Sequence, residues 1–323
     1  MIHWLTPGVF PTLPQLADCP LASVRLRIRP CISKFLSKGV SVSCGDVVNT
    51  VAESLFIGKI GQGPDLAERA THWLRILQAH KDKKKKVILD YTDPHLTVIS
   101  PQSDFYKQAL ELTDIVVCSS TALAESCAGL VGAKALRVIE DWNEYPCIGP
   151  KTRSNTEQRN LLWFGHQLNL NYLTHWLQSR SADSVSGTLT VLTGADTHLH
   201  KQRVMSNLPR GVNLNWQTWS QKAVIQHALG TDWLILPGSL VEDRKRYVSS
   251  NRLIAGLSLG LPILATPALS YQPFSEYFRA IAGSAGDLEN PDEYYEAIAE
   301  FQYRKLPQFN ENSLGDKWLE LLS

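Results

Sequence analysis

Short apolar segments alternate with helical stretches along the whole chain, and this alternation constrains the fold more than any other feature. Strands that are apolar throughout and are each followed by a helix are typical of parallel sheets covered by helices on both faces. The predicted strands are Ile2–Leu5, Val40–Cys44, Leu55–Lys59, Val87–Tyr91, Ile115–Cys118, Leu136–Ile139, Leu161–Phe164, Leu189–Thr193, Val212–Trp216, Trp233–Leu236 and Ile263–Ala265. Helical spacing lies between them at Asp65–Gln78, Asp104–Leu112, Gln221–Leu229 and Asn251–Leu259.

The chain is long enough for two such sheets. Its 323 residues suit two domains of about 150 residues each. The stretch Asp141–Gln158 contains Pro146, Gly149 and Pro150 and has no apolar periodicity, so we place the domain boundary there. We therefore expect an α/β protein with two Rossmann-like, doubly wound domains, residues 1–150 and 151–305, that face a cleft. Ligands bind such sheets at the carboxyl ends of the strands.

Charge and cysteine content exclude several classes of protein. The chain has 32 Lys and Arg residues against 31 Asp and Glu, which gives no electrostatic basis for binding a nucleic acid. No apolar run approaches the roughly 20 residues that span a bilayer. The N-terminus lacks the pattern of a secretory signal, and no cysteine or histidine spacing indicates a metal site. We expect a cytoplasmic protein without bound metal.

The segment from Thr231 to Pro267 carries the clearest chemical pattern. A buried strand ends at Pro237 and is followed by a polar loop and then a helix that Gly260 terminates. The free N–H groups of a helix N-terminus, together with nearby cations, form a site for anions such as a diphosphate. The alternative is a plain helix cap beside a solvated loop. The candidate diphosphate ligands are Arg244, Lys245, Ser249, Ser250, Asn251 and Arg252.

A family resemblance rests on this segment and on others in the same order. Its motifs are Leu236–Glu242, Ser250–Ile254 and Gly260–Ala265, preceded by Asp114–Ser120, Val138–Asp141 and Leu161–Gly165. Together they resemble the group-1 GT-B glycosyltransferases, which are retaining enzymes that use nucleotide sugars. The resemblance implies a nucleotide-diphosphate sugar as co-substrate, no further cofactor and no catalytic metal. It also implies a last helix, residues 306–323, that returns to the N-terminal domain.

The resemblance assigns further residues in the second half. Glu242 corresponds to the first of two family glutamates and would lie beside the transferred sugar. The second would fall at Ala255, so the ribose contact of the family is missing unless Asn251 replaces it. The glycine-rich loop expected after the first strand is also absent, and a basic run, Arg25, Arg27 and Arg29, occupies that region.

Four more residues in the second half are donor-site candidates. Gly165 and His166 follow the first strand of the C-terminal domain and would approach the donor phosphates. Trp216 and Trp219 bracket the loop that holds the nucleobase in the family, and an indole can stack on a base. Core packing is the alternative for either tryptophan.

In the first half, Asp90, Asp93 and His95 form the densest set of ionisable groups at a strand end. Such groups orient or deprotonate an acceptor hydroxyl. In the resembling family the leaving diphosphate accepts the proton, so these residues would orient the acceptor. The alternatives are a turn built on Asp93 and Pro94 and, less favoured by this pattern, a metal site.

The run Lys81–Lys86 ends a predicted helix, where lysines complement the helix dipole. It could instead contact an anionic membrane from the inner face if the acceptor is lipid-linked. The sequence leaves the acceptor open as a glycan, a lipid-linked sugar or a small molecule.

Competing functions share the expected fold. A nucleotide-sugar epimerase, a sugar phosphorylase and an inactive nucleotide-sugar-binding or partner protein would all have a similar pattern of strands. A nicotinamide dehydrogenase is disfavoured because no GxGxxG motif follows a predicted strand.

Overall fold

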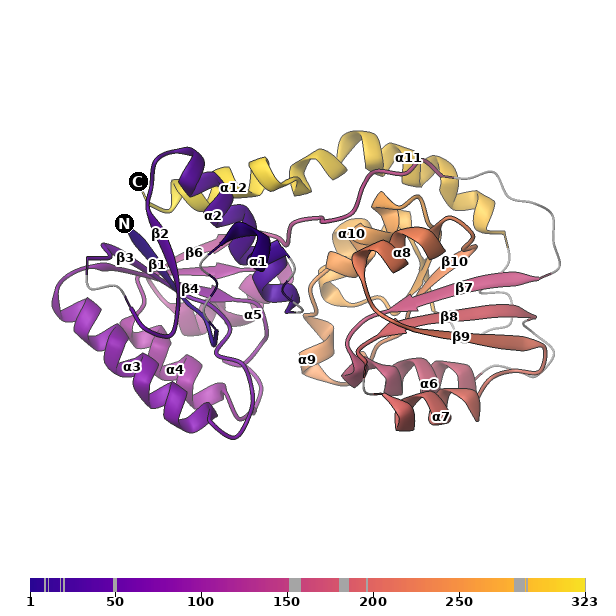
Figure 1. Ribbon diagram of the computed structural model, residues 1–323, viewed down its shortest axis with the longest axis horizontal. Helices are drawn as coiled ribbons and strands as arrows, with labels where there is room; N and C mark the ends of the chain where they lie inside the picture. Colours follow the sequence, from indigo (N-terminus) through magenta and orange to yellow (C-terminus); the bar gives the residue numbers. More distant parts are fainter. Residues whose placement is uncertain are drawn as a thin grey trace. The chain divides into compact units, whose positions relative to one another are not determined.

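The computed structural model in Figure 1 describes residues 1–8, 10, 12–17, 19, 21–48, 51–150, 158–179, 186–195, 197–281, 288 and 290–322. It contains two compact units. Unit 1 comprises Met1–Asn143, Tyr247–Ser249 and Gln308–Ser323, and unit 2 comprises Glu144–Arg246 and Ser250–Pro307. The domain boundaries predicted at 150/151 and 305/306 thus differ from those of the structure. No described helix is both long and apolar enough to cross a membrane.

Unit 1 is built on a sheet of six parallel strands in the order β2-β1-β3-β4-β5-β6. All the strands predicted in the first half of the sequence are present, with small shifts at their ends. The strands are β1 Ile2–Leu5, β2 Val42–Gly45, β3 Ser54–Ile57, β4 Lys86–Tyr91, β5 Ile115–Cys118 and β6 Ala135–Val138.

Helices cover both faces of this sheet. One apolar cluster joins the sheet to α3, α4 and α5, and a second joins its other face to α1, α2 and α12. The last helix is therefore part of unit 1, where Trp318 lies in the second cluster. The helices are α1 Leu13–Ala17, the π-helix η1 Val24–Ile28, α2 Arg29–Ser37, α3 Leu66–Asp82, α4 Ser103–Leu112, α5 Thr121–Val131 and α12 Glu311–Glu320.

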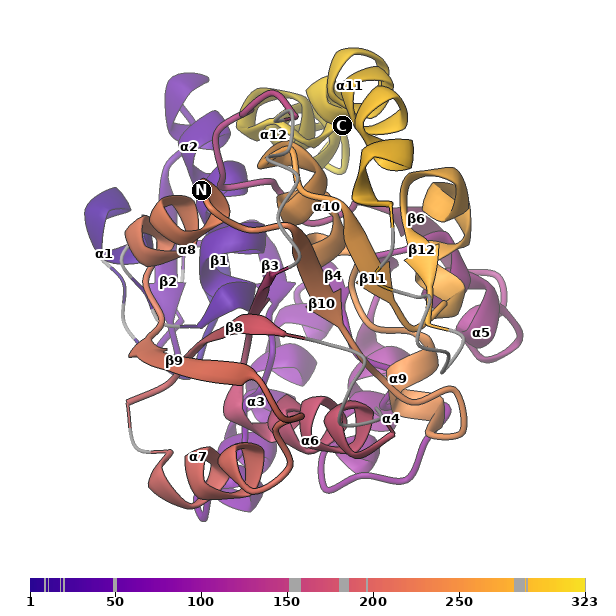
Figure 2. The same ribbon diagram turned by 90° about the vertical axis from the view of Figure 1, so that its right-hand side faces the viewer.

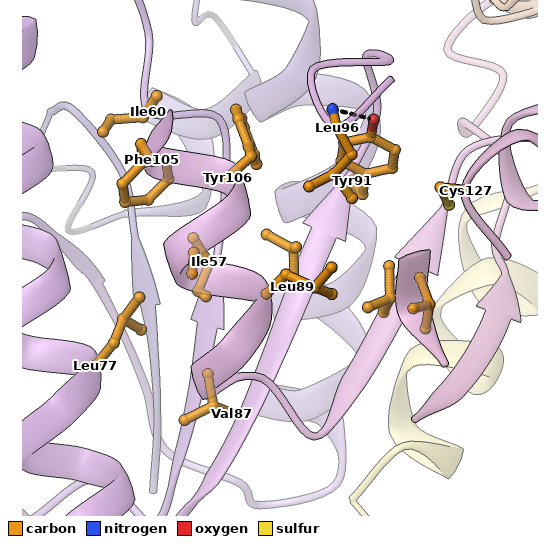
Figure 3. Packing of buried hydrophobic residues seen from close by; sticks show 14 of the residues in the cluster. Ile57, Ile60, Leu77, Val87, Leu89, Tyr91, Leu96, Phe105, Tyr106 and Cys127 are labelled. Carbon is orange, nitrogen blue, oxygen red and sulfur yellow. Dashed lines mark hydrogen bonds between the residues drawn. The ribbon is translucent and has the colours of Figure 1, made fainter. Parts of the chain in front are cut away.

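Strand β4 illustrates how the sheet positions the segment that follows it. Val87, Leu89 and Tyr91 alternate along the strand and point to the same face, toward α3 and α4 (Figure 3). The Tyr91 hydroxyl accepts a hydrogen bond of 2.8 Å from the Leu96 N–H. This bond ties the end of the loop after β4 back to the core, and with it the residues between 92 and 96.

Unit 2 contains a second sheet of six parallel strands in the order β12-β11-β10-β7-β8-β9. Counted from β7, this is the strand order of a Rossmann fold. The prediction missed only β12, which has two residues and is too short to show an apolar run. The strands are β7 Arg159–Phe164, β8 Gly187–Thr193, β9 Val212–Thr218, β10 Trp233–Leu236, β11 Ile263–Ala265 and β12 Arg279–Ala280.

The helices of unit 2 also lie on two faces. Helices α6 and α7 pack against one face, while α8, α10 and α11 lie on the other (Figures 1 and 2). The helices are η2 Gln167–Asn169, α6 Leu170–Gln178, α7 His198–Met205, α8 Gln221–Ala228, α9 Asp243–Arg246, α10 Asn251–Ser258, η3 Leu269–Tyr277, η5 Pro291–Tyr294 and α11 Tyr295–Arg304, with η6 Leu306–Phe309 at the boundary of the units.

Two glycines bring helix α10 close to its neighbours. A Cβ atom on Gly256 would lie 2.4 Å from Leu234 Cδ2, so only glycine allows the helix to pack this closely on β10. Gly260 follows the helix at φ +72°, a left-handed conformation that ends helices, and a Cβ there would lie 2.5 Å from the Ile148 carbonyl oxygen. These contacts fix the C-terminal half of α10 against β10 and the end of the helix against the segment that contains Ile148.

The buried His80 in the last turn of α3 makes the stability of the fold pH-dependent. Its Nε2 has no hydrogen-bond partner among the described residues, and burial, reinforced by the charge of Lys85, lowers its pKa below 6.5. On acidification, His80 therefore binds a proton in the unfolded chain at a higher pH than in the folded chain. The free energy of unfolding decreases as the pH falls from 6.5 through the pKa of His80 in the folded state.

We expect His80→Gln to reduce the loss of stability between pH 7.5 and pH 5.0. One titrating group contributes at most about 1.4 kcal/mol per pH unit to this slope. Urea denaturation at several pH values measures it, and His72→Gln, at an exposed histidine of the same helix, is the matched control. Equal slopes for the wild type and His80→Gln would contradict the expected proton uptake.

Candidate active site

The carboxyl edge of the sheet in unit 2 has a topological switch point between β7 and β10. Strand β7 pairs with β8 on one side and with β10 on the other, so the chain winds in opposite directions from it. In open α/β sheets, ligands bind at such a switch point, beside the loops that leave the two strands. Most residues predicted to bind the donor come from these two loops and from α10.

Arg252 reaches this edge from the first turn of α10. Its Nη1 donates a hydrogen bond of 3.3 Å to the carbonyl oxygen of Phe164, the last residue of β7. A Cβ on Gly165 would lie 3.0 Å from the same nitrogen, so the absence of a side chain there makes room for the guanidinium. The structure thus brings Gly165 and Arg252 together, with the cation beside the N-terminus of α10.

A second set of contacts links the two loops. The Lys245 ammonium donates a hydrogen bond of 2.5 Å to Asn169 Oδ1 and lies 5.1 Å from the centre of the Tyr172 ring. The Tyr172 hydroxyl donates a hydrogen bond of 2.6 Å to Glu242 Oε2. Burial is the main cause and this bond to the carboxylate is the second cause that raises the pKa of Tyr172 to about 12. Tyr172 thus remains a hydrogen-bond donor to Glu242 at neutral pH.

The loop after β10 is held by its own hydrogen bonds. The Ser239 hydroxyl accepts bonds from the N–H groups of Val241 and Glu242, at 3.2 and 3.1 Å. The Gly238 N–H donates to Thr266 Oγ1 at 2.9 Å, which ties the loop to the end of β11. Glu242 is therefore held at both its backbone and its side chain, although it is exposed to solvent.

His166 directly follows Gly165 in the loop after β7. Its Nδ1 accepts a hydrogen bond of 3.3 Å from the Leu168 N–H at the start of η2. In the neutral ring the proton is then assigned to Nε2, which makes this nitrogen a hydrogen-bond donor. A donor at this position is suited to a phosphate oxygen.

The N-terminus of α10 differs from the expected capping arrangement. Ser250 occupies the N-cap position, but its side chain makes no capping hydrogen bond. The Ser249 hydroxyl donates instead to Asp141 Oδ2, and the segment Tyr247–Ser249 belongs to unit 1, where Tyr247 packs against the core. Neither Ser249 nor Ser250 therefore caps the helix through its side chain, which was the alternative to an anion site. Asn251 begins the helix itself.

The two tryptophans predicted to hold a nucleobase have different environments. Trp216 packs against the apolar core of unit 2, and its Nε1 donates to Thr197 Oγ1 at 3.2 Å. Trp219 directly follows β9, and its backbone N–H donates a hydrogen bond of 2.7 Å to the Thr193 carbonyl oxygen. Trp219 therefore lies at the carboxyl edge of the sheet, whereas the ring of Trp216 has a structural role.

Of the acceptor-side residues predicted in unit 1, Asp93 and His95 lie in contact, with Asp93 Oδ2 3.9 Å from His95 Nε2. Asp90 is inside β4 and 3% exposed, and Arg27 binds its carboxylate through a contact of 2.5 Å. Asp93 pairs with Lys59 at 2.7 Å. His95 is buried, with Nδ1 2.8 Å from Ser100 Oγ and its ring stacked on Tyr106. In the part of the chain that the structure describes, no group of three or more His, Cys, Asp or Glu side chains is placed to hold a metal.

Lys81–Lys86 is largely engaged in contacts within unit 1. Lys81 pairs with Asp114, Lys85 with Glu53 at 3.2 Å, and the Lys86 ammonium donates to the Leu321 carbonyl at 3.0 Å. Lys83 and Lys84 are exposed. These contacts give most of the run a structural role at the end of α3.

Two residues of the site were missed by the sequence analysis, Asn169 and Tyr172. Both follow β7 within the next helical turns, in a segment that contains several polar residues at a strand's carboxyl end. That position was itself a signal for a ligand site. Their bonds to Lys245 and Glu242 join residues that are 76 and 70 positions apart in the sequence, and no local pattern predicts such pairing.

Comparison with known proteins adds information about the fold. Neither a family model nor a curated protein matches the sequence. Similar solved structures include HepE from Anabaena in complex with UDP and glucose, with a TM-score of 0.58 and 11% identity over 99% of this chain and 98% of that one. AviGT4, a glycosyltransferase involved in avilamycin A biosynthesis, has a TM-score of 0.56 and 10% identity over 99% and 96%.

A third similar structure is an epimerase. The UDP-GlcNAc 2-epimerase from Neisseria meningitidis, bound to UDP-GlcNAc, has a TM-score of 0.52 and 10% identity over 100% of this chain and 99% of its own. At such identities a likeness establishes the fold. The two Rossmann-like sheets and these neighbours show that this chain has the fold of the GT-B glycosyltransferases, as its sequence motifs implied.

Proposed function

We propose that this protein is a glycosyltransferase that moves a sugar from a nucleotide-diphosphate sugar to an acceptor hydroxyl. The observation that carries the proposal is the set of side chains at the carboxyl ends of β7 and β10. Arg252 in the first turn of α10 contacts the end of β7, Lys245 and Glu242 from the loop after β10 contact Asn169 and Tyr172, and His166 follows β7. This combination fits a diphosphate beside a sugar.

The proposed roles follow from the charges that develop during transfer. The bond from the anomeric carbon to the diphosphate breaks, and its electron pair leaves with the diphosphate oxygen. Arg252 and Lys245 stabilise this charge electrostatically. A bond forms between the anomeric carbon and the acceptor oxygen, whose proton passes to the departing diphosphate. We propose retention of configuration, no catalytic metal and no cofactor besides the nucleotide sugar.

The remaining assignments are part of the proposal. Trp219 would stack on the nucleobase, and Glu242 would hydrogen-bond the transferred sugar. The acceptor would bind unit 1, which contains Asp90, Asp93 and His95. Contact between Lys81–Lys86 and an anionic membrane stays a prediction that applies to a lipid-linked acceptor, and it depends chiefly on the exposed Lys83 and Lys84.

An epimerase is the second candidate, because an epimerase bound to UDP-GlcNAc is among the similar structures. The two functions give different products. Incubation with UDP-glucose, UDP-galactose or UDP-GlcNAc should yield free UDP and, with an acceptor mixture, a new glycoside detected by mass spectrometry. Conversion of the nucleotide sugar to a stereoisomer without an acceptor would establish the epimerase instead. Binding without any turnover would identify an inactive nucleotide-sugar-binding protein.

Glu242→Gln is expected to lower the rate of transfer at least tenfold and to leave the melting temperature nearly unchanged. The glutamine keeps the shape and can still accept the Tyr172 bond, but it removes the charge beside the sugar. Exposed surface residues seldom change stability by more than about 0.5 kcal/mol. Initial rates of UDP release measure the effect.

Asp243→Asn provides the matched control, since Asp243 is the next residue and its carboxylate is exposed and paired with Arg246. Transfer at the full wild-type rate by Glu242→Gln would show that Glu242 lies away from the sugar.

A further inference from the structure

A polar cavity lies between helices α6 and α7 of unit 2. The two helices lie side by side against one face of the sheet (Figures 1 and 2). The cavity has a volume of about 140 Å³ and is open to solvent. Pockets for drug-sized molecules have about 300–1,000 Å³, so this cavity suits a smaller ligand. Its six lining residues are Asn171, Thr174, His175 and Gln178 from α6, and His200 and Arg203 from α7.

Helical periodicity brings these side chains together. The four lining residues of α6 are spaced three or four positions apart, so they share one face of the helix. The opposite face contains Leu170, Leu173 and Leu177, which are buried in the core of unit 2. His200 and Arg203 are three positions apart on α7 and also share a face. The polar stripes of two core-packed helices therefore meet at the cavity.

The charge around this cavity favours an anion. Neither helix contains an acidic residue, and α7 carries Lys201 and Arg203, so the two helices have a net charge of +2 when their histidines are neutral. In the part of the chain that the structure describes, no carboxylate pairs with Arg203, and the rings of His175 and His200 make no hydrogen bond. The excess positive charge is thus not compensated locally.

The lining supplies hydrogen-bond donors that suit a group with several oxygens. The Arg203 guanidinium has five N–H groups in a planar fork, which can bind two oxygens of a phosphate at once. Each of the two imidazoles offers an N–H, and the Gln178 carboxamide offers two more. The Thr174 hydroxyl donates to the Leu170 carbonyl at 2.9 Å, so it can only accept. Donors from both helices therefore face the same small volume.

A metal ion is the alternative ligand for two neighbouring imidazoles. Zinc sites in proteins have three or four protein ligands. Among the described residues, no third His, Cys, Asp or Glu side chain joins His175 and His200 in such a group. The Arg203 guanidinium in the same lining would also repel a cation. The residues of the cavity thus favour an anion over a metal.

We propose that this cavity binds a phosphomonoester group, with Arg203 as the main ligand and His175 and His200 as further donors. The group occurs in soluble compounds such as glycerol 3-phosphate and as the headgroup of phosphatidic acid. The cavity extends along α6 to Gln178, the last residue of the helix, and thus away from the carboxyl edge of the sheet. The site is therefore separate from the candidate active site, and the proposal does not depend on the proposed function.

Isothermal titration calorimetry of the full chain with inorganic phosphate, at constant ionic strength, tests the proposal. Arg203→Gln should weaken binding at least about tenfold, the lower end of what a charge-assisted hydrogen bond contributes. Lys201→Gln is the matched control, because it removes the same charge from the same helix but Lys201 does not line the cavity. This control should bind phosphate within about twofold of the wild type.

Two further variants keep the result specific to this cavity. Phosphate can also bind near Arg252 in the candidate active site, so Arg252→Ala is titrated as well and should retain the wild-type affinity for phosphate. His200→Ala should weaken binding as Arg203→Gln does, although by less. Arg203 is exposed, so the melting temperature of Arg203→Gln without phosphate should equal that of the wild type.

The proposal is overturned if phosphate does not bind at concentrations up to about 20 mM, well above the millimolar range of weak specific sites. Equal affinities of Arg203→Gln and Lys201→Gln would also overturn it, as would a loss in Arg252→Ala alone. Binding of Zn²⁺ that requires both His175 and His200, without binding of phosphate, would replace it with a metal site.

Two probes distinguish the sources of the phosphomonoester. Binding of glycerol 3-phosphate that is lost in Arg203→Gln would support a soluble ligand. Flotation with vesicles of phosphatidylcholine and phosphatidic acid, lost in Arg203→Gln but kept in Lys201→Gln, would support the lipid headgroup. If neither probe binds although inorganic phosphate does, the cavity is a site for free phosphate and the phosphomonoester is ruled out.

Discussion

Replacing Arg27 with methionine is expected to lower the free energy of unfolding by about 3–5 kcal/mol, the cost of removing one partner from a buried ion pair. Arg27 is 1% exposed and binds Asp90, Asp141 and the Ile139 carbonyl, and its guanidinium lies 5.1 Å from the centre of the Trp318 ring. The methionine would leave two carboxylates buried without a cation.

Urea denaturation of the full chain, with hydrogen exchange to locate the loss in unit 1, measures this change. Arg29→Met is the matched control, because Arg29 is partly exposed and pairs with Glu311 at 3.6 Å. Such a pair contributes about 0–1 kcal/mol. Adding Asp90→Asn to Arg27→Met should recover part of the loss, because it removes one unpaired charge. Similar losses for the Arg27 and Arg29 variants would contradict a buried charge network.

The parallel sheets could be predicted from the sequence because their signals are local. Strands such as Ile115–Cys118 and Trp233–Leu236 are continuous apolar runs between helical segments, and both were placed with the bounds that the structure has. Strand β12 gives no such signal. The short segment Tyr247–Ser249 also could not be assigned to unit 1, since this depends on Tyr247 packing against a core formed by residues far away in sequence.

Buried charges were the main obstacle to predicting the site. The run Arg25, Arg27 and Arg29 was noted where a phosphate-binding loop was expected, yet Arg25 and Arg27 are buried in η1. Arg25 donates to the Cys19 carbonyl at 2.6 Å, and Arg27 pairs with Asp90. Sequence patterns assign charged residues to the surface, so a pair separated by 63 residues becomes visible only in the folded chain.

Arg252, in contrast, contacts a residue that belongs to another of the sequence motifs. The string from Ser250 to Ile254 and that from Leu161 to Gly165 were assigned to one donor region, and the structure joins them through the bond from Arg252 to the Phe164 carbonyl. The proximity of these two strings follows from the fold, because the ends of adjacent parallel strands and the start of the next helix meet at one edge in every doubly wound sheet. Their role in binding a donor stays a prediction.

Arg252→Ala should therefore weaken UDP binding by about 1.5–3 kcal/mol, which is about 10-fold to 150-fold in the dissociation constant. The guanidinium lies beside Gly165 at the N-terminus of α10, where a charge-assisted bond to a diphosphate adds to the helix dipole. Isothermal titration calorimetry with UDP measures the loss, and uridine, which lacks the diphosphate, should bind both proteins equally.

Arg210→Ala removes the same charge from the opposite edge of the sheet, because Arg210 is exposed shortly before β9 begins. This control isolates local contact from the effect of net charge, and it should retain wild-type affinity. If Arg252→Ala kept its melting temperature and bound UDP as tightly as Arg210→Ala, the diphosphate would have to lie elsewhere. An equal loss of affinity for uridine would instead assign Arg252 to the nucleoside rather than to the phosphates.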